Sequence, residues 1–181
     1  MASNEPVTEV MSRAGRGTTA DSEAGNTKPR AWQSVLDQLG GGGWYWLASV
    51  TPDGRPHVMP LFAVWSESVL FVASNMTTRK SRNLAAKGAC VVTADKGDLH
   101  LIVEGNARRV EEEPTLRRAA AAFDATYGWP LAVAGTELDA PYGAPTSGGP
   151  PYAVWEVTPT IAFGLPADGE SFAPTRWRFA T

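Results

Sequence analysis

The fold is decided by residues 69–83, which read VLFVASNMTTRKSRN. The first five, 69–73, are rich in β-branched and aromatic side chains and are too few for a helix, so they predict a buried strand. From 78 to 86 the pattern predicts a helix that has Thr77 or Thr78 as its N-cap. Three cations follow this cap: Arg79, Lys80 and Arg82.

This helix start has the chemistry of an anion site. Hydroxyl groups, backbone amides without a helical partner and positively charged side chains all favour a phosphate group. A capped, solvated surface helix accounts for the same residues, and basic side chains in a first turn oppose the helix dipole. The residues by themselves therefore leave both interpretations open.

The chain has 181 residues, which is enough for one domain with a substantial core. We expect a disordered tail over 1–30, which has no large apolar residue after Met11, and one domain over 31–181. Part of the tail could instead lie over a partner subunit. The formal net charge of −3 disfavours nucleic-acid binding, because the basic cluster is only a local feature.

No apolar stretch is long enough to span a bilayer, and the tail contains acidic side chains and no apolar segment of the signal-peptide type. We therefore expect no membrane helix and a cytoplasmic protein. The single cysteine, Cys90, lies in an apolar run and is expected to be a buried side chain.

Apolar runs of strand length recur along the rest of the chain. They lie at 44–50, 55–65, 89–94 and 99–110, and shorter runs follow between 152 and 179. Pro60 predicts an edge strand or a bulge, because proline has no N–H for a ladder. Helices are expected at 31–39 and 115–127, and 128–151 is expected to be a long loop, either a lid or a disordered connection. Six or seven strands with short helices between them predict a mainly β fold, a closed or partly closed antiparallel barrel.

Few catalytic or metal-binding arrangements are possible. The only histidines are His57 and His100, each within a predicted strand. No GxSxG motif is present, and the glycine run at 40–43 lies between a helix and a strand, the wrong order for a dinucleotide fold. We therefore expect neither a nucleophilic triad nor a metal site.

Large aromatic side chains are numerous for a barrel of this size. The tryptophans on which this point depends are Trp44, Trp46, Trp65, Trp155 and Trp177. We expect some of them to cover a neighbouring subunit in a two-fold homodimer. The alternative is one large core with an aromatic rim.

The order and spacing of several segments resemble the pyridoxamine 5'-phosphate oxidase-like, FMN-binding split-barrel superfamily over about residues 33–179. These segments are Gly54–Leu61, Leu70–Ser74, Thr78–Leu84, Cys90–Val92 and Val103–Ala107. The segments Pro159–Gly164 and Thr175–Phe179 are similar to actinobacterial members that use the deazaflavin coenzyme F-420. The resemblance implies an antiparallel split β-barrel and a homodimer that binds its cofactor at the subunit interface.

The resemblance also implies a set of cofactor-binding residues. Five would place their backbone along the ring system: His57, Val58, Met59, Pro60 and Leu61. Two would line the phosphate or ribityl side: Ala73 and Ser74. Three would hold the phosphate: Thr78, Arg79 and Lys80. His100 would lie near the ring, Trp177 completes the set, and Asn83 would cap or buttress the helix.

We expect an oxidoreductase that transfers a hydride between coenzyme F-420 and a small organic acceptor such as an enone or a quinone. F-420 is preferred to FMN because its longer anionic chain needs cations spread over a longer path. The cations available are Arg55, Arg79, Lys80, Arg82 and Lys87. No catalytic residue is assigned, although His100, Tyr127 or Tyr142 could deliver a proton.

Two alternatives stay open. The first is an FMN-dependent flavoprotein. The oxidase proper has a late Arg-x-His pattern, but this chain has Arg176-Trp177-Arg178, so oxidation of vitamin B6 is not expected. The second is a non-catalytic module that holds the cofactor, or that holds heme through His57 or His100.

Overall fold

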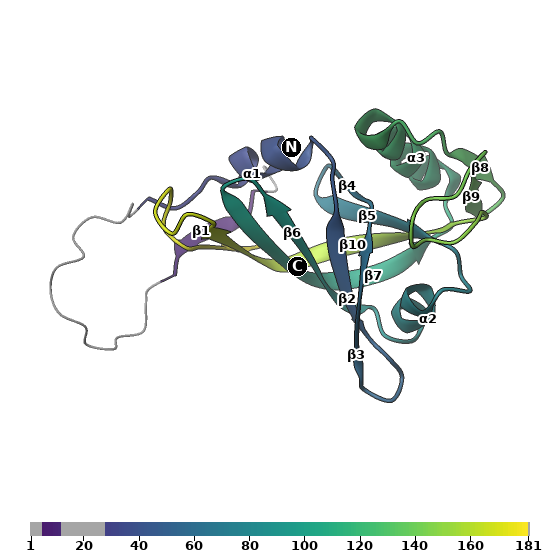
Figure 1. The fold of residues 1–181 in the computed structure, drawn as a ribbon, viewed down its shortest axis with the longest axis horizontal. Coiled ribbons are helices and arrows are strands. Elements are labelled where there is room, and N and C mark those ends of the chain that lie inside the picture. Colours follow the sequence, from purple (N-terminus) through teal and green to yellow (C-terminus); the bar gives the residue numbers. More distant parts are fainter. Residues whose placement is uncertain (1–4, 12–27, 181) are drawn as a thin grey trace, which may run out of the picture.

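The computed structural model describes residues 5–11 and 28–180 (Figure 1). Its helices are α1 (Trp32–Leu39), α2 (Arg79–Ala86) and α3 (Glu113–Tyr127). The strands are β1 (Val7–Val10), β2 (Tyr45–Val50), β3 (Pro56–Leu61), β4 (Ala63–Ser66), β5 (Val69–Ser74), β6 (Ala89–Lys96), β7 (Leu99–Val110), β8 (Ala132–Ala134), β9 (Glu137–Asp139), β10 (Ala153–Pro166) and β11 (Thr175–Arg178).

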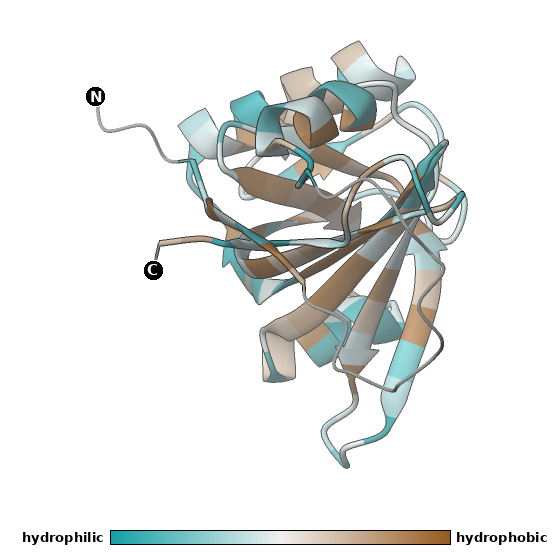
Figure 2. Cartoon of the chain, turned by 90° about the vertical axis from the view of Figure 1, so that its left-hand side faces the viewer, coloured by the Kyte–Doolittle hydropathy of each residue, from teal (hydrophilic) through white to brown (hydrophobic). Residues whose placement is uncertain are grey.

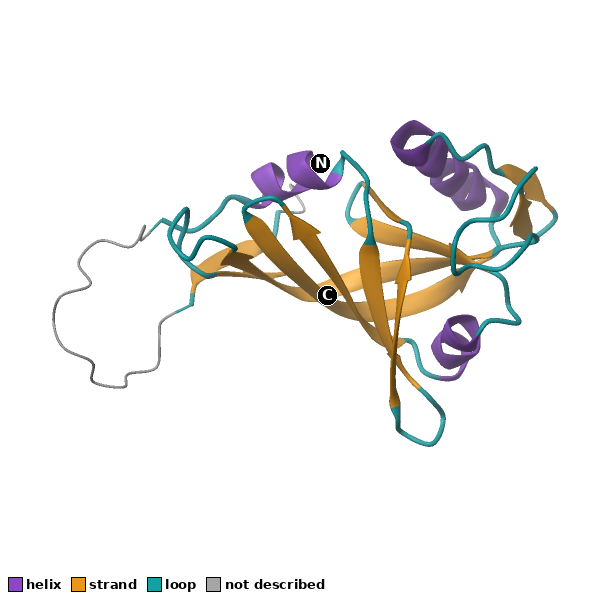
Figure 3. Ribbon diagram, in the orientation of Figure 1, coloured by secondary structure: helices purple, strands orange, loops and turns teal. Residues whose placement is uncertain are grey.

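Nine of the described strands form one sheet in which every pairing is antiparallel (Figure 3). The order runs β1-β11-β10-β7-β6-β2-β3, and β5 pairs with β10 on one side and with β4 on the other. Only Phe62 separates β3, at one end of this order, from β4, at the end of the branch that leaves β10 through β5. The chain itself therefore joins the two open ends, and the fold is a split antiparallel β-barrel, as the sequence predicts.

The strands divide their apolar side chains between two cores, because successive residues of a strand point to opposite faces. In β5, Leu70 and Val72 pack in the barrel core, whereas Phe71 and Ala73 pack in a second core against α3. Four residues form the buried face of α3: Leu116, Ala119, Ala120 and Phe123. Figure 2 shows the hydrophobic residues concentrated on the strands.

The stretch from 69 to 86 folds as its sequence predicts. Residues 69–73 lie in β5, and Thr78 is the N-cap of α2, where its Oγ1 accepts a hydrogen bond from the Ser81 N–H at 3.3 Å. The predicted helices at 31–39 and 115–127 are α1 and α3, and Cys90 is buried.

The N-terminal tail needs a correction. The strand β1 lies within the segment predicted to be disordered, and it pairs with β11 from Val7↔Arg178 to Val10↔Thr175. Glu9 forms ion pairs with Arg176 and Arg178, which supply the contacts that tie this strand down. The rest of the predicted tail, apart from 5–11 and 28–30, lies outside the described residues.

The segment 128–151 also differs from the predicted long loop. It contains the hairpin of β8 and β9, whose turn uses Gly135 at a φ of 64°. Leu138 of β9 is fully buried and exchanges backbone hydrogen bonds with Tyr152. With β1, β4 and this hairpin, the described residues contain more strands than the six or seven predicted, because these additional strands are only three or four residues long.

Gly105 lies at a close approach between the two longest strands, β7 and β10. A Cβ atom at this position would lie 2.4 Å from the carbonyl oxygen of Thr158. The pairing register shifts nearby, between Pro159 and Ile161, so the irregularity falls in β10. Over residues 5–11 and 28–180, no helix is both long and apolar enough to cross a membrane.

Candidate functional site

The strand β3 forms one edge of the split in the barrel. Among the described strands it pairs only with β2. The carbonyl oxygen of Pro60 accepts a hydrogen bond from Thr146 Oγ1, so this carbonyl points away from β2. Because backbone groups alternate along an antiparallel strand, the N–H and C=O of Val58 point the same way. Pro60 therefore occupies an edge strand, as predicted, and its missing N–H costs the ladder nothing.

The start of α2 lies at the other side of the split. Ser74, at the end of β5, has its Oγ 2.9 Å from Thr78 Oγ1, and its carbonyl accepts a hydrogen bond from Ser81 Oγ at 3.4 Å. Further along α2, Asn83 Nδ2 donates to Ser49 Oγ at 3.0 Å in a buried position. Asn83 thus fastens α2 to β2 and buttresses the helix, as expected.

Lys80 is the unusual member of this helix, because its side chain is almost fully buried. Its Nζ donates to the backbone carbonyl of Thr146. Burial lowers the pKa of Lys80 to about 8, since a charged ammonium loses solvation in such a place. An ammonium has three N–H donors, so this group retains capacity to bind an anion.

Thr146 connects the two sides of the split. Its carbonyl accepts from Lys80 of α2, and its hydroxyl donates to Pro60 of β3. Its φ of 65° is in the left-handed region, which is uncommon for a β-branched residue. The sequence does not single out Thr146, although the glycine-rich and proline-rich segment around it is predicted as a potential lid.

The residues next to Thr146 cover the end of β5. Ser147 Oγ donates to the carbonyl of Ala73 at 3.1 Å, and the Asn75 N–H donates to the carbonyl of Ser147 at 3.0 Å. Asn75 Nδ2 donates to the carbonyl of Gly149 at 2.9 Å. Ala73 and Ser74 are both buried.

His57 lies at the N-terminal part of β3, close to the first turn of α2. Its pKa is lowered first by burial and then by the positive charges of Arg79 and Lys80. Its Nδ1 atom is buried and has no hydrogen-bond partner among the described residues. The structure therefore places ten of the predicted site residues on the three elements that border the split: His57, Val58, Met59, Pro60, Leu61, Ala73, Ser74, Thr78, Arg79 and Lys80. The side chains of Leu61 and Ala73 are buried in the two apolar cores.

Two predicted site residues are not brought to this place. Trp177 is fully buried in the barrel core, where it packs against Trp32 and donates through Nε1 to the carbonyl of Arg30 at 3.2 Å. Its assignment as a cofactor contact is corrected, because its ring fills space above Gly164 inside the chain's own core. His100 is exposed on β7, with β6 and β2 between it and β3, and its Nδ1 contacts Asp95.

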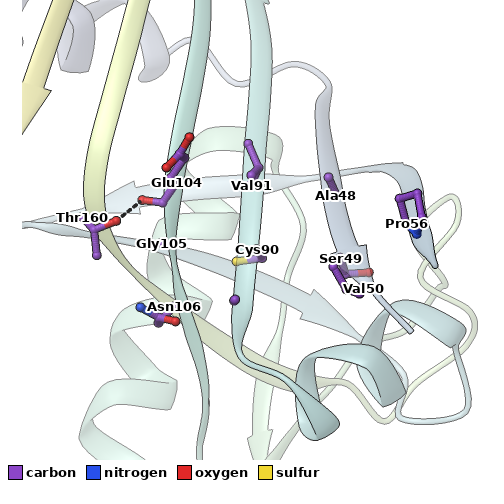
Figure 4. Close-up of a pocket in the computed structure, with 11 residues that line it drawn as sticks. Ala48, Ser49, Val50, Pro56, Cys90, Val91, Glu104, Gly105, Asn106 and Thr160 are labelled. Carbon is purple, nitrogen blue, oxygen red and sulfur yellow. Dashed lines mark hydrogen bonds between the residues drawn. The ribbon is translucent and has the colours of Figure 1, made fainter. Parts of the chain in front are cut away.

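A separate pocket of about 390 Å³ opens on the sheet near the end of β2 (Figure 4). Its lining includes Ser49, Cys90 and Glu104, and Thr160 donates to the carbonyl of Glu104 at 3.2 Å. Burial raises the pKa of Cys90 to about 11, so the thiol stays protonated and is a poor nucleophile. Glu104 is the one charged residue of the lining, so this pocket does not suit a phosphate group.

Within the described residues, no three His, Cys, Asp or Glu side chains converge in a way that could hold a metal ion. The polar chemistry of the split consists of hydroxyls, backbone groups, one imidazole and cations. Such a donor set suits an anionic ligand that has a hydrogen-bonding ring edge.

Three solved structures share this fold at low sequence identity. A heme binding protein from Mycobacterium smegmatis has a TM-score of 0.59 and 15% identity, over 84% of this chain and 59% of that one. A pyridoxamine 5'-phosphate oxidase-related, FMN binding protein from Nostoc punctiforme has a TM-score of 0.53 and 16% identity, over 80% of this chain and 87% of that one. A protein named F-420 reductase has a TM-score of 0.50 and 22% identity, over 70% of this chain and 93% of that one. These likenesses concern the fold.

At the level of sequence, no curated protein matches the chain significantly. A family model does match, over residues 35–163, and it is described as pyridoxamine 5'-phosphate oxidase. The match runs from α1 to β10 and includes both sides of the split. The chain therefore belongs to the pyridoxamine 5'-phosphate oxidase family.

Proposed function

We propose that this protein is an oxidoreductase that holds coenzyme F-420, or FMN as the alternative, in the split of the barrel. It would transfer a hydride between this cofactor and a small organic acceptor such as an enone or a quinone. The observation that carries the proposal is the placement of the free edge of β3 beside the cation-bearing start of α2. One side offers backbone groups to a ring edge, and the other offers charge to a phosphate.

The residues of the split fit such a group. Lys80 is a buried ammonium whose acceptor is a neutral carbonyl, and a phosphate oxygen would be a stronger partner. The buried Nδ1 of His57 lacks a partner within the described part of the chain, and Val58 has backbone groups on the free edge. When bound, the reduced ring would supply the hydride, with its two electrons, and water would supply the proton that completes reduction of the acceptor.

Thr146 bonds to both Lys80 and Pro60 and would have to move when a cofactor binds. Its two hydrogen bonds, to Lys80 and to Pro60, satisfy the groups that the phosphate and the ring would engage. Binding therefore exchanges one set of partners for another, and part of the binding free energy offsets the displacement of 146–149. A charge-assisted hydrogen bond from Lys80 to the phosphate is stronger than its present bond to a carbonyl, which favours the exchange.

The choice of F-420 over FMN depends on cations beyond the first turn of α2. Lys87 is exposed at the far end of the helix, about 14 Å from the cap at the usual rise per residue. Arg55, at the tip of the β2–β3 hairpin, is paired with Asp53 at 3.0 Å. Arg82 donates to the carbonyl of Thr77 at 2.7 Å and so stays near the cap. The separation of these charges favours the longer anionic ligand.

Titration of the purified protein with each cofactor tests the choice, and turnover tests the function. We expect submicromolar binding of F-420 and reduction of a cyclic enone or a quinone by the loaded protein. Tight binding of FMN with no measurable affinity for F-420 would leave the FMN-dependent flavoprotein as the function. Binding of either cofactor with no turnover on a broad panel of acceptors would reduce the protein to a binding module.

A homodimer is part of this proposal, although the structure points to other interface residues than the five tryptophans named from the sequence. Trp155 and Trp177 are buried in the chain's own core, so they are not among the tryptophans that could cover a neighbouring subunit, and Trp65 is half-buried. The outer face of the sheet supplies better candidates, which share one face by their pairing: Trp46, Val58, Val91, Ile102 and Phe163. Trp46 is 49% exposed and Val58 is 51% exposed. Light scattering at micromolar concentration should give twice the monomer mass, and a monomer would remove the shared-site model.

A heme-binding module is the second candidate, and one observation favours it. Burial and the charges of Arg79 and Lys80 lower the pKa of His57, which favours its neutral imidazole, the form that ligates a metal. If this candidate were correct, added hemin would give a sharp Soret band that His57→Ala abolishes. A spectrum that does not change in His57→Ala or in His100→Ala would exclude histidine ligation.

A further inference from the structure

Three aromatic rings form a column where β3 ends. Trp44 precedes β2, Phe62 links β3 to β4, and Tyr127 is the last residue of α3. The Trp44 and Phe62 ring centroids are 5.0 Å apart with 36° between the planes. The Phe62 and Tyr127 centroids are 4.4 Å apart with 22° between the planes. Rings from three separate segments are thus in contact: Phe62 and Tyr127 are stacked, and Trp44 is tilted against Phe62.

Backbone contacts fix the inner end of this column. The Tyr127 hydroxyl lies 2.9 Å from the carbonyl oxygens of both Gly43 and Ala63 and donates its one hydrogen to them. Burial raises the pKa of Tyr127 to about 12, so the hydroxyl stays protonated. Gly42 makes the approach possible, because a Cβ there would lie 3.2 Å from Tyr127 Cε1. Tyr127 is therefore a positioned stacking ring and a poor proton donor, which corrects that expectation.

The outer end of the column is open. Trp44 is 48% exposed, whereas Tyr45, the next residue, is buried. A single exposed aromatic side chain is ordinary on a protein surface. Trp44 differs from such an isolated side chain because its ring packs against Phe62, and this contact fixes the orientation of the ring before any ligand binds. A preorganised, exposed aromatic face binds another flat ring with little loss of side-chain entropy.

The column lies at one end of the free edge of β3, and the cations lie near the other. His57 is the β3 residue affected by Arg79 and Lys80, and Phe62 directly follows the last residue of β3. A ligand whose phosphate meets α2 and whose ring follows β3 would therefore point its ring end toward the column. No ionised side chain belongs to the column itself, so it suits an uncharged ring.

From these observations we infer that Trp44, Phe62 and Tyr127 form the stacking subsite for the acceptor, and that the acceptor is a planar, conjugated ring compound. This inference rests on the proposed function for its redox meaning, but the subsite itself can be tested without a cofactor. A quinone fused to an aromatic ring fits this description, whereas a saturated ring of equal size does not.

The test measures binding of 2-methyl-1,4-naphthoquinone to the cofactor-free protein by calorimetry. Trp44→Leu should raise the dissociation constant about three- to tenfold, the range expected for losing one stacked ring. Trp44→Phe is the matched control, because it keeps an aromatic ring at the same exposed position and should retain most of the affinity. Phe62→Leu, checked for an unchanged melting temperature, should weaken binding in the same range.

A saturated bicyclic ketone provides the second arm, and it should bind weakly and equally to all three variants and to the wild type. Equal affinity of Trp44→Leu and wild type for the quinone, or equal weakening by Trp44→Phe, would overturn the subsite. Turnover separates the two proposals. Quinone binding that depends on Trp44, without reduction by the cofactor-loaded protein, would contradict the redox function but not the subsite. Reduction of the quinone with an unchanged KM in Trp44→Leu would contradict the subsite but not the redox function.

Discussion

The ammonium group of Lys80 donates a hydrogen bond to the backbone carbonyl of Thr146, which lies 66 residues further along the chain. This contact places a buried cation against a neutral carbonyl at the start of α2. Burying an ammonium is costly unless a strong partner compensates it. The arrangement therefore leaves Lys80 ready to exchange Thr146 for an anion.

Cofactor affinity should depend on pH through Lys80. Its pKa is lowered to about 8, so the ammonium is charged below that pH and becomes a neutral amine above it. Affinity for FMN should fall as the pH rises through about 8, by up to about tenfold between about pH 7 and about pH 9. The phosphate is doubly ionised across this window, because its second pKa is about 6. Fluorescence titration of FMN at several pH values measures the effect.

Lys80→Arg is the control for this dependence. Arginine keeps its charge throughout the window, so the affinity of this variant should stay constant with pH. A parallel decline in the wild type and in Lys80→Arg would assign the pH dependence to another group.

Removing cations should separate the two cofactors. Lys80→Ala should weaken both FMN and F-420 by about 10- to 100-fold, since a charge-assisted hydrogen bond contributes about 1.5–3 kcal/mol. Lys87→Ala and Arg55→Ala should weaken only F-420, by a few-fold that shrinks as salt rises, because both side chains are exposed. Lys96→Ala removes another partly buried lysine, one that donates to Gly42, and should leave both affinities unchanged. Equal losses for FMN in Lys87→Ala would contradict the choice of F-420.

Thr146→Gly should strengthen cofactor binding by a few-fold. Glycine adopts a φ of 65° without strain and has no hydroxyl to donate to the carbonyl of Pro60. The free edge of β3 would then be open at a lower cost, while the loss of the hydrogen bond and the relief of strain nearly offset each other in folding. Calorimetric titration measures the cofactor affinity, and a melting curve measures the stability of the variant. Weaker binding by a stable variant would mean that Thr146 itself contacts the cofactor.

Gly105→Ala should destabilise the barrel by at least about 2 kcal/mol, the range for forcing atoms into a packed strand pair. The added Cβ would lie 2.4 Å from the carbonyl oxygen of Thr158, and neither backbone can move without disturbing the pairing of β7 and β10. Gly149→Ala is the comparison, because no atom lies within 4 Å of a Cβ built there. Chemical denaturation gives the free energy of unfolding of each variant. Similar values for the two variants would show that β10 shifts at its bulge to accommodate the added Cβ.

The sequence predicts the elements whose causes are local. Residues 69–73 form a strand by composition, Thr78 caps α2 with its own hydroxyl, and the face of α3 follows from the spacing of Leu116 and Phe123. Pro60 reports an edge strand because its missing N–H excludes a central one. In each case the residues that interact lie within one or two turns or along one strand.

The tertiary structure decides what depends on partners far away in the chain. Nothing near Val7 in sequence shows that β1 pairs with β11, and nothing near Trp177 shows that its ring lies in the barrel core. The contacts of Thr146 with Lys80 and with Pro60 likewise join the two sides of the split. Local propensity and capping act over a few residues, whereas burial and the pairing of distant groups are settled only when the strands close on one another.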